Sequence, residues 1–185
     1  MTVRLSGPPK RVVASGATRS SGVSHKRLRS KHLQRAEGER SQGTRGSSTT
    51  HHPKLDRALL ARRARRLLRE IGRPDAELSL ALVDDRAIAL LNERDRGRRG
   101  PTDVLSYSLL EGPHAERRGR LLGDVVISVD TASRQARARR RAMDDEVLRL
   151  LIHGVLHLLG HDHVEPEEAR AMRAQERRLR RALGA

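Results

Sequence analysis

Four histidines lie within the segment HGVLHLLGHDH, which runs from His153 to His163. His153 and His157 are four residues apart in a Leu-rich stretch, so on a helix both rings project from one face, one turn apart. Gly160 can adopt the left-handed conformation that ends a helix and turns the chain back toward that face. His163 is then the natural third ligand of a single metal ion, with His161 as the alternative.

The spacing from His153 to His163 reproduces the metzincin pattern H-E-x-x-H-x-x-G-x-x-H. One position differs, because Gly154 stands where a metzincin has the Glu that acts as general base. Three imidazoles without a fourth protein ligand are typical of a catalytic zinc site, which keeps one coordination position open. Zinc lowers the pKa of bound water to about 7, so the missing Glu is tolerable. The sequence therefore predicts one zinc ion per chain.

Basic residues dominate the composition. Lys and Arg number 39 against 23 Asp and Glu, which gives a net charge of +16 and predicts a polyanionic partner. Tyr107 is the only aromatic residue, which excludes the base-stacking platforms of RRM and OB modules and leaves this side chain to the core or to one stacked base. Cysteine is absent, so disulfides and thiolate sites are excluded and metal chemistry must use His and carboxylates.

Residues 1–53 have the composition of a disordered arm. Ser, Gly, Thr and Pro make up 23 of these 53 residues, and the apolar residues show no periodicity. The arm carries +9 of the net charge and residues 54–185 carry +7. It is either a nucleic-acid tether or an extension without function, and residues 54–185 are expected to fold. No apolar stretch reaches about 18 residues and no signal peptide is visible, so the chain is expected to be soluble and not exported.

The folded part alternates helical and strand patterns. Acidic residues mark three helix starts: Asp84 or Asp85 for the second helix, Asp130 for the third and Asp144 for the fourth. Gly-rich and polar loops are expected over residues 94–103 and 111–120. Helices are predicted over residues 55–71, 85–91, 131–141, 144–159 and 166–183, and strands over 77–85, 104–110 and 121–130.

These motifs together resemble the bacterial YbeY endoribonucleases, also called rRNA maturation factors. The segment HGVLHLLGHDH is similar to the family signature HGxLHLxGYDH, with His161 in place of Tyr. GPTDVLSYS, residues 100–108, resembles PT(D/N)VLSFP, and LLGDVVIS, residues 121–128, resembles LGDIVIS. A family Arg lies five residues before the Pro of the second motif, and Arg96 occupies that position. The resemblance covers residues 55–183 and leaves the basic arm outside.

The resemblance implies an α/β fold in which a small mixed sheet packs against helices, with zinc held by His153, His157 and His163. It implies a single-strand-specific, zinc-dependent endoribonuclease of the bacterial cytoplasm. The implied role is maturation of the 16S rRNA 3′ end and quality control of the small ribosomal subunit. The implied partners are rRNA, the small subunit, one of its proteins and a ribosome-assembly GTPase, with no membrane.

Candidate catalytic residues are Arg96 and His153. An Arg guanidinium binds phosphate oxygens bidentately, so Arg96 can hold a scissile phosphate or stabilise charge that develops on it. The basic helix over residues 131–141 is the candidate RNA-backbone surface, with Arg134, Arg137 and Arg140 as its contacts. Two alternatives stay open: a non-catalytic ribosome assembly factor braced by zinc, and a zinc peptidase, which Gly154 disfavours.

Overall fold

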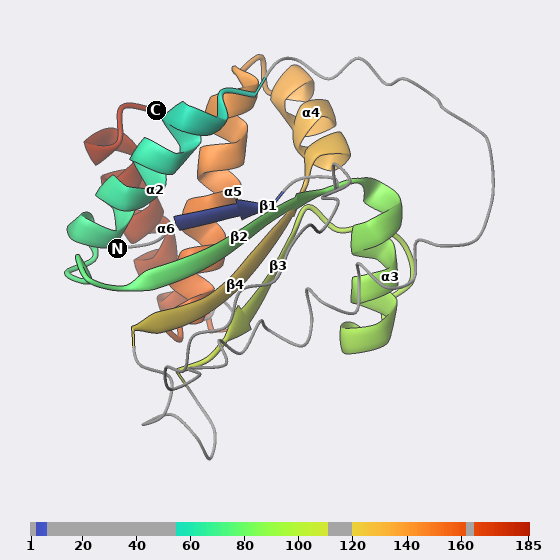
Figure 1. The fold of residues 1–185 in the computed structure, drawn as a ribbon, viewed down its shortest axis with the longest axis horizontal. Coiled ribbons are helices and arrows are strands. Elements are labelled where there is room, and N and C mark those ends of the chain that lie inside the picture. The colour runs from blue at the N-terminus through green and yellow to red at the C-terminus, as the bar shows by residue number, and fades with distance from the viewer. Residues whose placement is uncertain (1–2, 7–54, 111–119, 162–164) are drawn as a thin grey trace, which may run out of the picture.

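The computed structural model describes residues 3–6, 55–110, 120–161 and 165–185 (Figure 1). These residues form a mixed α/β arrangement, as predicted. The strands are β1 (Val3–Ser6), β2 (Glu77–Val83), β3 (Val104–Ser108) and β4 (Leu121–Ser128). The helices are α2 (Arg57–Glu70), α3 (Asp85–Arg96), α4 (Val129–Ala138), α5 (Met143–Leu158) and α6 (Pro166–Ala182). Within the described ranges, no helix has the length and apolar character needed to cross a membrane.

The four strands make one sheet in the order β1-β2-β4-β3. Strand β2 runs parallel to β1 and to β4, whereas β3 runs antiparallel to β4, which confirms the predicted mixed sheet. Strand β1 corrects one expectation, because Val3–Ser6 pairs with β2 although residues 1–53 were predicted to be a disordered arm. The alternation of apolar residues that marks a strand is too short to detect in four residues. The rest of the arm lies outside the described residues.

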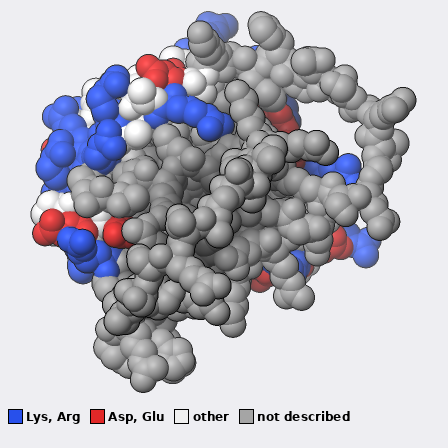
Figure 2. Space-filling model, in the orientation of Figure 1, with Lys and Arg blue, Asp and Glu red and all other residues white. Residues whose placement is uncertain are grey.

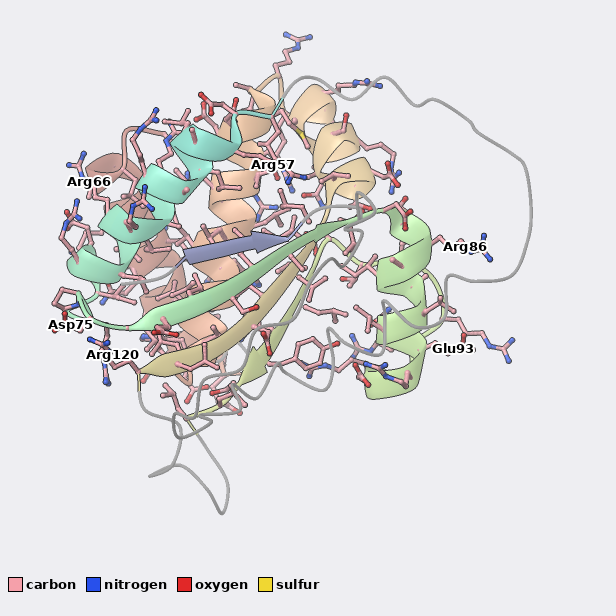
Figure 3. All side chains as sticks on the ribbon, in the orientation of Figure 1. Arg57, Arg66, Asp75, Arg86, Glu93 and Arg120 are labelled. Atoms are coloured by element: carbon pink, nitrogen blue, oxygen red, sulfur yellow. The ribbon has the colours of Figure 1, made fainter. Side chains whose placement is uncertain are left out.

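Helices cover the two faces of the sheet unequally (Figure 1). Helices α2, α5 and α6 pack on one face over the larger apolar cluster, which takes Leu80 from β2 and Val125 and Ile127 from β4. Helix α3 covers part of the other face over a smaller cluster that includes Val126. Both clusters are built from Leu, Val, Ile, Ala and Met, with Tyr107 partly buried beside the smaller one. Figure 3 shows that long polar side chains such as Arg66 and Arg86 project outward instead.

Side-chain caps start α2, α3 and α4, whereas α5 begins without one at Met143, one residue before the predicted start at Asp144. The Asp84 side chain accepts a hydrogen bond from the Ala87 amide and caps α3, as predicted. Helix α4, however, is capped by Ser128 and begins at Val129, so the predicted cap Asp130 is wrong. Strand β4 runs directly into α4, and the Ser128 hydroxyl reaches the first turn before Asp130 can.

Candidate metal centre

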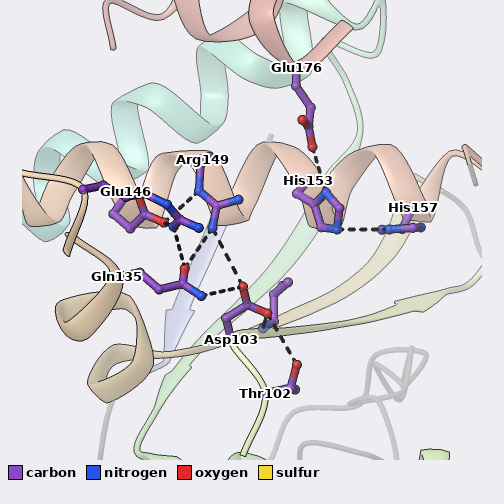
Figure 4. A network of polar contacts seen from close by, with 10 residues as sticks. Thr102, Asp103, Gln135, Glu146, Arg149, His153, His157 and Glu176 are labelled. Atoms are coloured by element: carbon purple, nitrogen blue, oxygen red, sulfur yellow. Dashed lines mark hydrogen bonds and ion pairs between the residues drawn. The ribbon is translucent and has the colours of Figure 1, made fainter. Parts of the chain in front are cut away.

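His153 and His157 meet on the exposed side of α5, as their spacing predicts. Their Nε2 atoms are 3.2 Å apart and their rings are nearly perpendicular, with centroids 4.6 Å apart (Figure 4). Two imidazole nitrogens bound to one tetrahedral zinc at about 2.0–2.1 Å are separated by about 3.3 Å. The pair therefore fits two corners of a zinc site.

Glu176 on α6 contacts His153. Its Oε1 atom lies 2.7 Å from His153 Nδ1, and the two side chains are 23% and 28% exposed. The hydrogen bond from His153 is the largest of the effects that lower the pKa of the Glu176 carboxyl, and it outweighs the cost of burial. With Nδ1 donating to the carboxylate, Nε2 keeps its lone pair for a metal ion.

Sequence reasoning missed Glu176, which is 23 residues from His153 and on another helix. A signal was nevertheless present. On α6, Met172 and Leu179 are buried in the core, and Glu176 stands between them on the same face, where an apolar residue is expected. A carboxylate that interrupts an apolar stripe needs a partner across the interface, and that partner is His153.

The predicted third ligand, His163, lies outside the described residues. Among the residues that the structure does describe, no group of three His, Cys, Asp or Glu side chains could hold a metal ion. His161 does not join the pair, because it lines a cavity of about 180 Å³ together with Leu156 and Leu159 of α5 and Ile71. Its amide binds the Leu156 carbonyl, and Gly160 is left-handed with φ of 84°, which confirms the predicted helix end.

Gly154 faces the sheet and not the histidine pair. A Cβ atom at Gly154 would lie 2.9 Å from both Ser106 Oγ and Val125 Cγ1, and 3.3 Å from Val104 Cγ2. Helix α5 approaches β3 and β4 this closely because position 154 has no side chain. A Glu here would collide with the sheet, so the general base of a metzincin has no room on this helix.

Arg96 ends α3 next to the free edge of β3. Its Nη2 atom donates to the Ser106 carbonyl at 3.1 Å, and the Ser106 side chain faces Gly154 on α5. The guanidinium is exposed and is thereby tied to the strand that runs beside the histidine helix. The structure thus ties Arg96 to β3, a strand that contacts α5.

Tyr107, also on β3, is held by contacts within the fold. It is half-buried, and its hydroxyl donates to Asp95 Oδ2 at 2.7 Å. Burial, followed by the Asp95 carboxylate, raises the pKa of this hydroxyl. Cross-strand from Tyr107, Asp124 is only 1% exposed, and its Oδ2 has no hydrogen-bond partner within the described part of the chain.

A second polar network lies one to two turns before His153 on α5 (Figure 4). Glu146 is fully buried, and its Oε1 accepts hydrogen bonds from Arg139 and from Arg149 Nε. Arg149 also donates to Gln135, whose amide nitrogen donates to Asp103 at 3.1 Å. The network joins α4, α5 and the start of β3, so Asp103 has a structural role here.

The three predicted RNA contacts differ in their surroundings. Arg134 forms an ion pair with Asp85 at 2.7 Å and donates to the Thr131 hydroxyl. Arg137 and Arg140 are exposed at the end of α4, and Arg140 has a left-handed backbone with φ of 53°. RNA contact by these residues stays a prediction.

Known proteins similar to this chain point to one family. The family model described as Endoribonuclease YbeY matches residues 47–184. Proteins named Endoribonuclease YbeY from Anaeromyxobacter sp. and Anaeromyxobacter dehalogenans are 50% and 51% identical over 138 residues, which are 74% of this chain and 70% of each relative. The protein of the same name from Syntrophus aciditrophicus is 44% identical over 128 residues, covering 68% of this chain and 80% of the relative.

A solved structure supports the fold independently. The solution structure of TM1509 from Thermotoga maritima superposes with a TM-score of 0.51 at 24% sequence identity, covering 71% of this chain and 85% of that one. At this identity the likeness bears on the fold alone. The match of the family model over most of the chain, together with relatives at half identity, shows that the chain belongs to the endoribonuclease YbeY family.

Proposed function

We propose that this protein is a single-strand-specific, zinc-dependent endoribonuclease. Its proposed role is maturation of the 16S rRNA 3′ end and quality control of the small ribosomal subunit in the bacterial cytoplasm. The observation that carries the proposal is the His153–His157 pair, whose Nε2 atoms are 3.2 Å apart in a chain of an endoribonuclease family.

In this proposal, His153 and His157 hold zinc through Nε2, and His163 is the third ligand. Zinc bound there supplies Lewis acidity at the scissile phosphodiester. Glu176 accepts the Nδ1 proton of His153, which fixes the ring orientation and makes Nε2 a better donor. The attacking group is water or the neighbouring 2′-hydroxyl.

Arg96 acts on the phosphate in this scheme. One of its nitrogens is held by the Ser106 carbonyl, which limits the positions that the guanidinium can take. The remaining N–H donors can bind a phosphate oxygen and stabilise the charge that develops on it. Substitution of Arg96 by Lys would keep the charge but lose the planar fork, so RNA cleavage should fall sharply.

The test is cleavage of a single-stranded precursor of the 16S rRNA 3′ end, with a duplex of the same sequence for comparison. We expect the zinc-loaded protein to cut the single strand, and a chelator or His157→Ala to abolish the activity. His161→Ala is the matched control. This imidazole follows the C-terminal end of α5 but lines the cavity instead of joining the histidine pair. Undiminished cleavage by the His157→Ala protein would sink the metal mechanism.

The two alternatives make different demands on the site. A zinc peptidase needs a general base, and Gly154 has neither the carboxylate nor the space for one. An assembly factor braced by zinc needs only binding to the small subunit, through one of its proteins or an assembly GTPase. A His157→Ala variant that folds, cuts no RNA and still restores ribosome maturation in cells would favour the assembly factor.

A further inference from the structure

Helix α6 carries a row of exposed arginines beside the residue that contacts His153. Arg170, Arg173, Arg177 and Arg181 follow one another at intervals of three, four and four residues, which places them on one side of the helix. The row is about 16 Å long at about 1.5 Å per residue. Within the described part of the chain, the side chains of Arg173, Arg177 and Arg181 have no hydrogen-bond or ion-pair partner.

The row lies on a defined flank of α6. An α-helix turns by about 100° per residue, so Arg173 and Arg177 are about 60° and 100° from Glu176 in one sense, and Gln175 is about 100° away in the other. Gln175 and Leu179 line the cavity that α6 shares with α2 and with Leu156 and Leu159. The arginines therefore face away from α2.

His153 and His157 also face away from that cavity. Leu156 of α5 and the adjoining Leu159 line the cavity wall, whereas His153 and His157 are not among the residues that line it. His153 of α5 contacts Glu176 of α6 where the two helices meet. The arginine row on α6 therefore lies beside Glu176, the residue of α6 that contacts the imidazole pair.

The other basic surfaces formed by described residues lack this combination. On α4, Arg134 and Arg139 are ion-paired with Asp85 and Glu146. Figure 2 shows Lys and Arg gathered over the region of α2. The described hydrogen bonds of His153 and His157 go to Glu176 of α6 and to each other, and none goes to α2. Within the described ranges, α6 is the helix that joins unpaired arginines to a direct contact with the histidine pair.

We propose that the arginine row of α6 binds the phosphate backbone of the RNA strand as it enters the histidine site. The inference rests on the proposed endoribonuclease function and names the surface that holds its substrate. The guanidinium groups of Arg173, Arg177 and Arg181 can bind phosphate without reading sequence, which suits a surface that positions a strand for cleavage elsewhere.

The test compares three double variants that each remove two positive charges. Arg173→Gln/Arg177→Gln alters the row, and Arg65→Gln/Arg69→Gln alters α2. Arg137→Gln/Arg140→Gln alters the competing RNA surface at the end of α4 that the sequence predicted. Binding of a fluorescent single-stranded RNA to the full chain is measured by anisotropy at several salt concentrations, with chelator present so that no strand is cut. Zinc content and unfolding midpoint of each variant are measured in parallel.

We expect the α6 variant to bind RNA about tenfold more weakly at low salt, with a salt slope lower by about 1.4, the value for two lost contacts to a single strand. The α4 and α2 variants should each lose less than half as much slope. Equal losses in all three variants, or no RNA binding by the unaltered protein, would overturn the inference. RNA cleavage by the unaltered protein is measured in a separate assay. A failure of the RNA-binding surface can therefore be told apart from a failure of the proposed endoribonuclease function.

Discussion

The two halves of α5 use polar side chains in opposite ways. In the first half, Glu146 is fully buried and is paired with Arg139 and Arg149 inside the contact with α4. In the second half, the side chain of His153 remains 28% exposed, and its ring contacts the Glu176 carboxylate through Nδ1 and His157 through Nε2. The same helix therefore carries one cluster that is turned inward and one that is open to a ligand.

The difference shows how burial separates structural from chemical polar groups. A charge that is removed from water must be paired, and breaking such a pair leaves a buried charge without compensation. An imidazole at a half-exposed position keeps a lone pair that a metal ion can reach. Substitutions in the first half should therefore lower the free energy of unfolding, and substitutions in the second half should lower the affinity for a metal ion.

The largest effect is expected for Glu146→Ala. Loss of the buried carboxylate leaves Arg149 with the more distant Asp103, at 3.8 Å, as its ion-pair partner, and the free energy of unfolding should fall by about 3–5 kcal/mol. Urea unfolding followed by circular dichroism measures it. Glu167→Ala, at an exposed position of α6, is the control and should change stability by less than about 0.5 kcal/mol. A loss below about 1 kcal/mol for Glu146→Ala would contradict the stabilising role of the buried Glu146 cluster.

Glu176→Gln tests the open cluster. The amide cannot stabilise the His153 Nδ1 proton as the carboxylate does, so zinc affinity should fall by about 10–100-fold. Competition with a coloured chelator measures the affinity, and nuclear magnetic resonance of the metal-free protein reports the tautomer of His153. Gln175→Glu, one residue away on the cavity flank, keeps the composition similar and should leave zinc affinity unchanged. A zinc affinity of Glu176→Gln equal to that of the unaltered protein would contradict the role of Glu176.

Gly154→Ala tests how tightly α5 is held to the sheet between the two clusters. Ala is favoured over Gly in a helix by about 1 kcal/mol, but the new methyl group meets Ser106 and Val125, and overpacking costs about 1–3 kcal/mol. We expect a net loss of about 1 kcal/mol in thermal or urea unfolding. Adding Ser106→Ala should recover part of it. A stabilised Gly154→Ala protein would mean that the helix can move away from the sheet at no cost.

The smallest effect concerns Asp85, a second polar group that joins elements within the fold. Burial raises the pKa of this carboxyl, but hydrogen bonds from Ser128, Thr131 and Arg134 outweigh burial and leave the pKa lowered. A lowered pKa means that the stabilisation is present above the ordinary value of 3.8 and is lost as pH falls through the folded value.

Asp85→Asn should therefore cost about 1 kcal/mol at pH 7. The difference from the unaltered protein should shrink as the pH falls below 3.8 in urea titrations. Asp75→Asn, at an exposed turn position, is the control and should show no such convergence. A constant difference between pH 7 and pH 3 would assign the effect of Asp85 to packing instead of charge.

Most elements of the described fold were predictable from periodicity and from residues that start or end helices. The pattern from Leu55 onward predicted α2, and Asp84 and Gly160 were placed correctly at the ends of α3 and α5. Strand β1 was missed because four residues in a polar segment carry too little pattern. The start of α4 was misplaced because Ser128 was read as part of a strand, when it is both the last strand residue and the cap.

The sequence by itself determined the chemistry that is available. The absence of Cys and of all aromatics but Tyr107 left the triad of His153, His157 and His163 as the metal-binding candidate, with the first two on one helix face. Helix periodicity is local, so this inference needed no tertiary information.

Only the tertiary structure decided which distant groups serve that pair. It brought Glu176 of α6 to His153, tied Arg96 to the edge of β3 and turned His161 into a cavity on the other flank. It also paired Arg134 with Asp85 and left the arginines of α6 exposed. Contacts between residues far apart in sequence depend on how the helices pack over the sheet, and no local spacing encodes that packing.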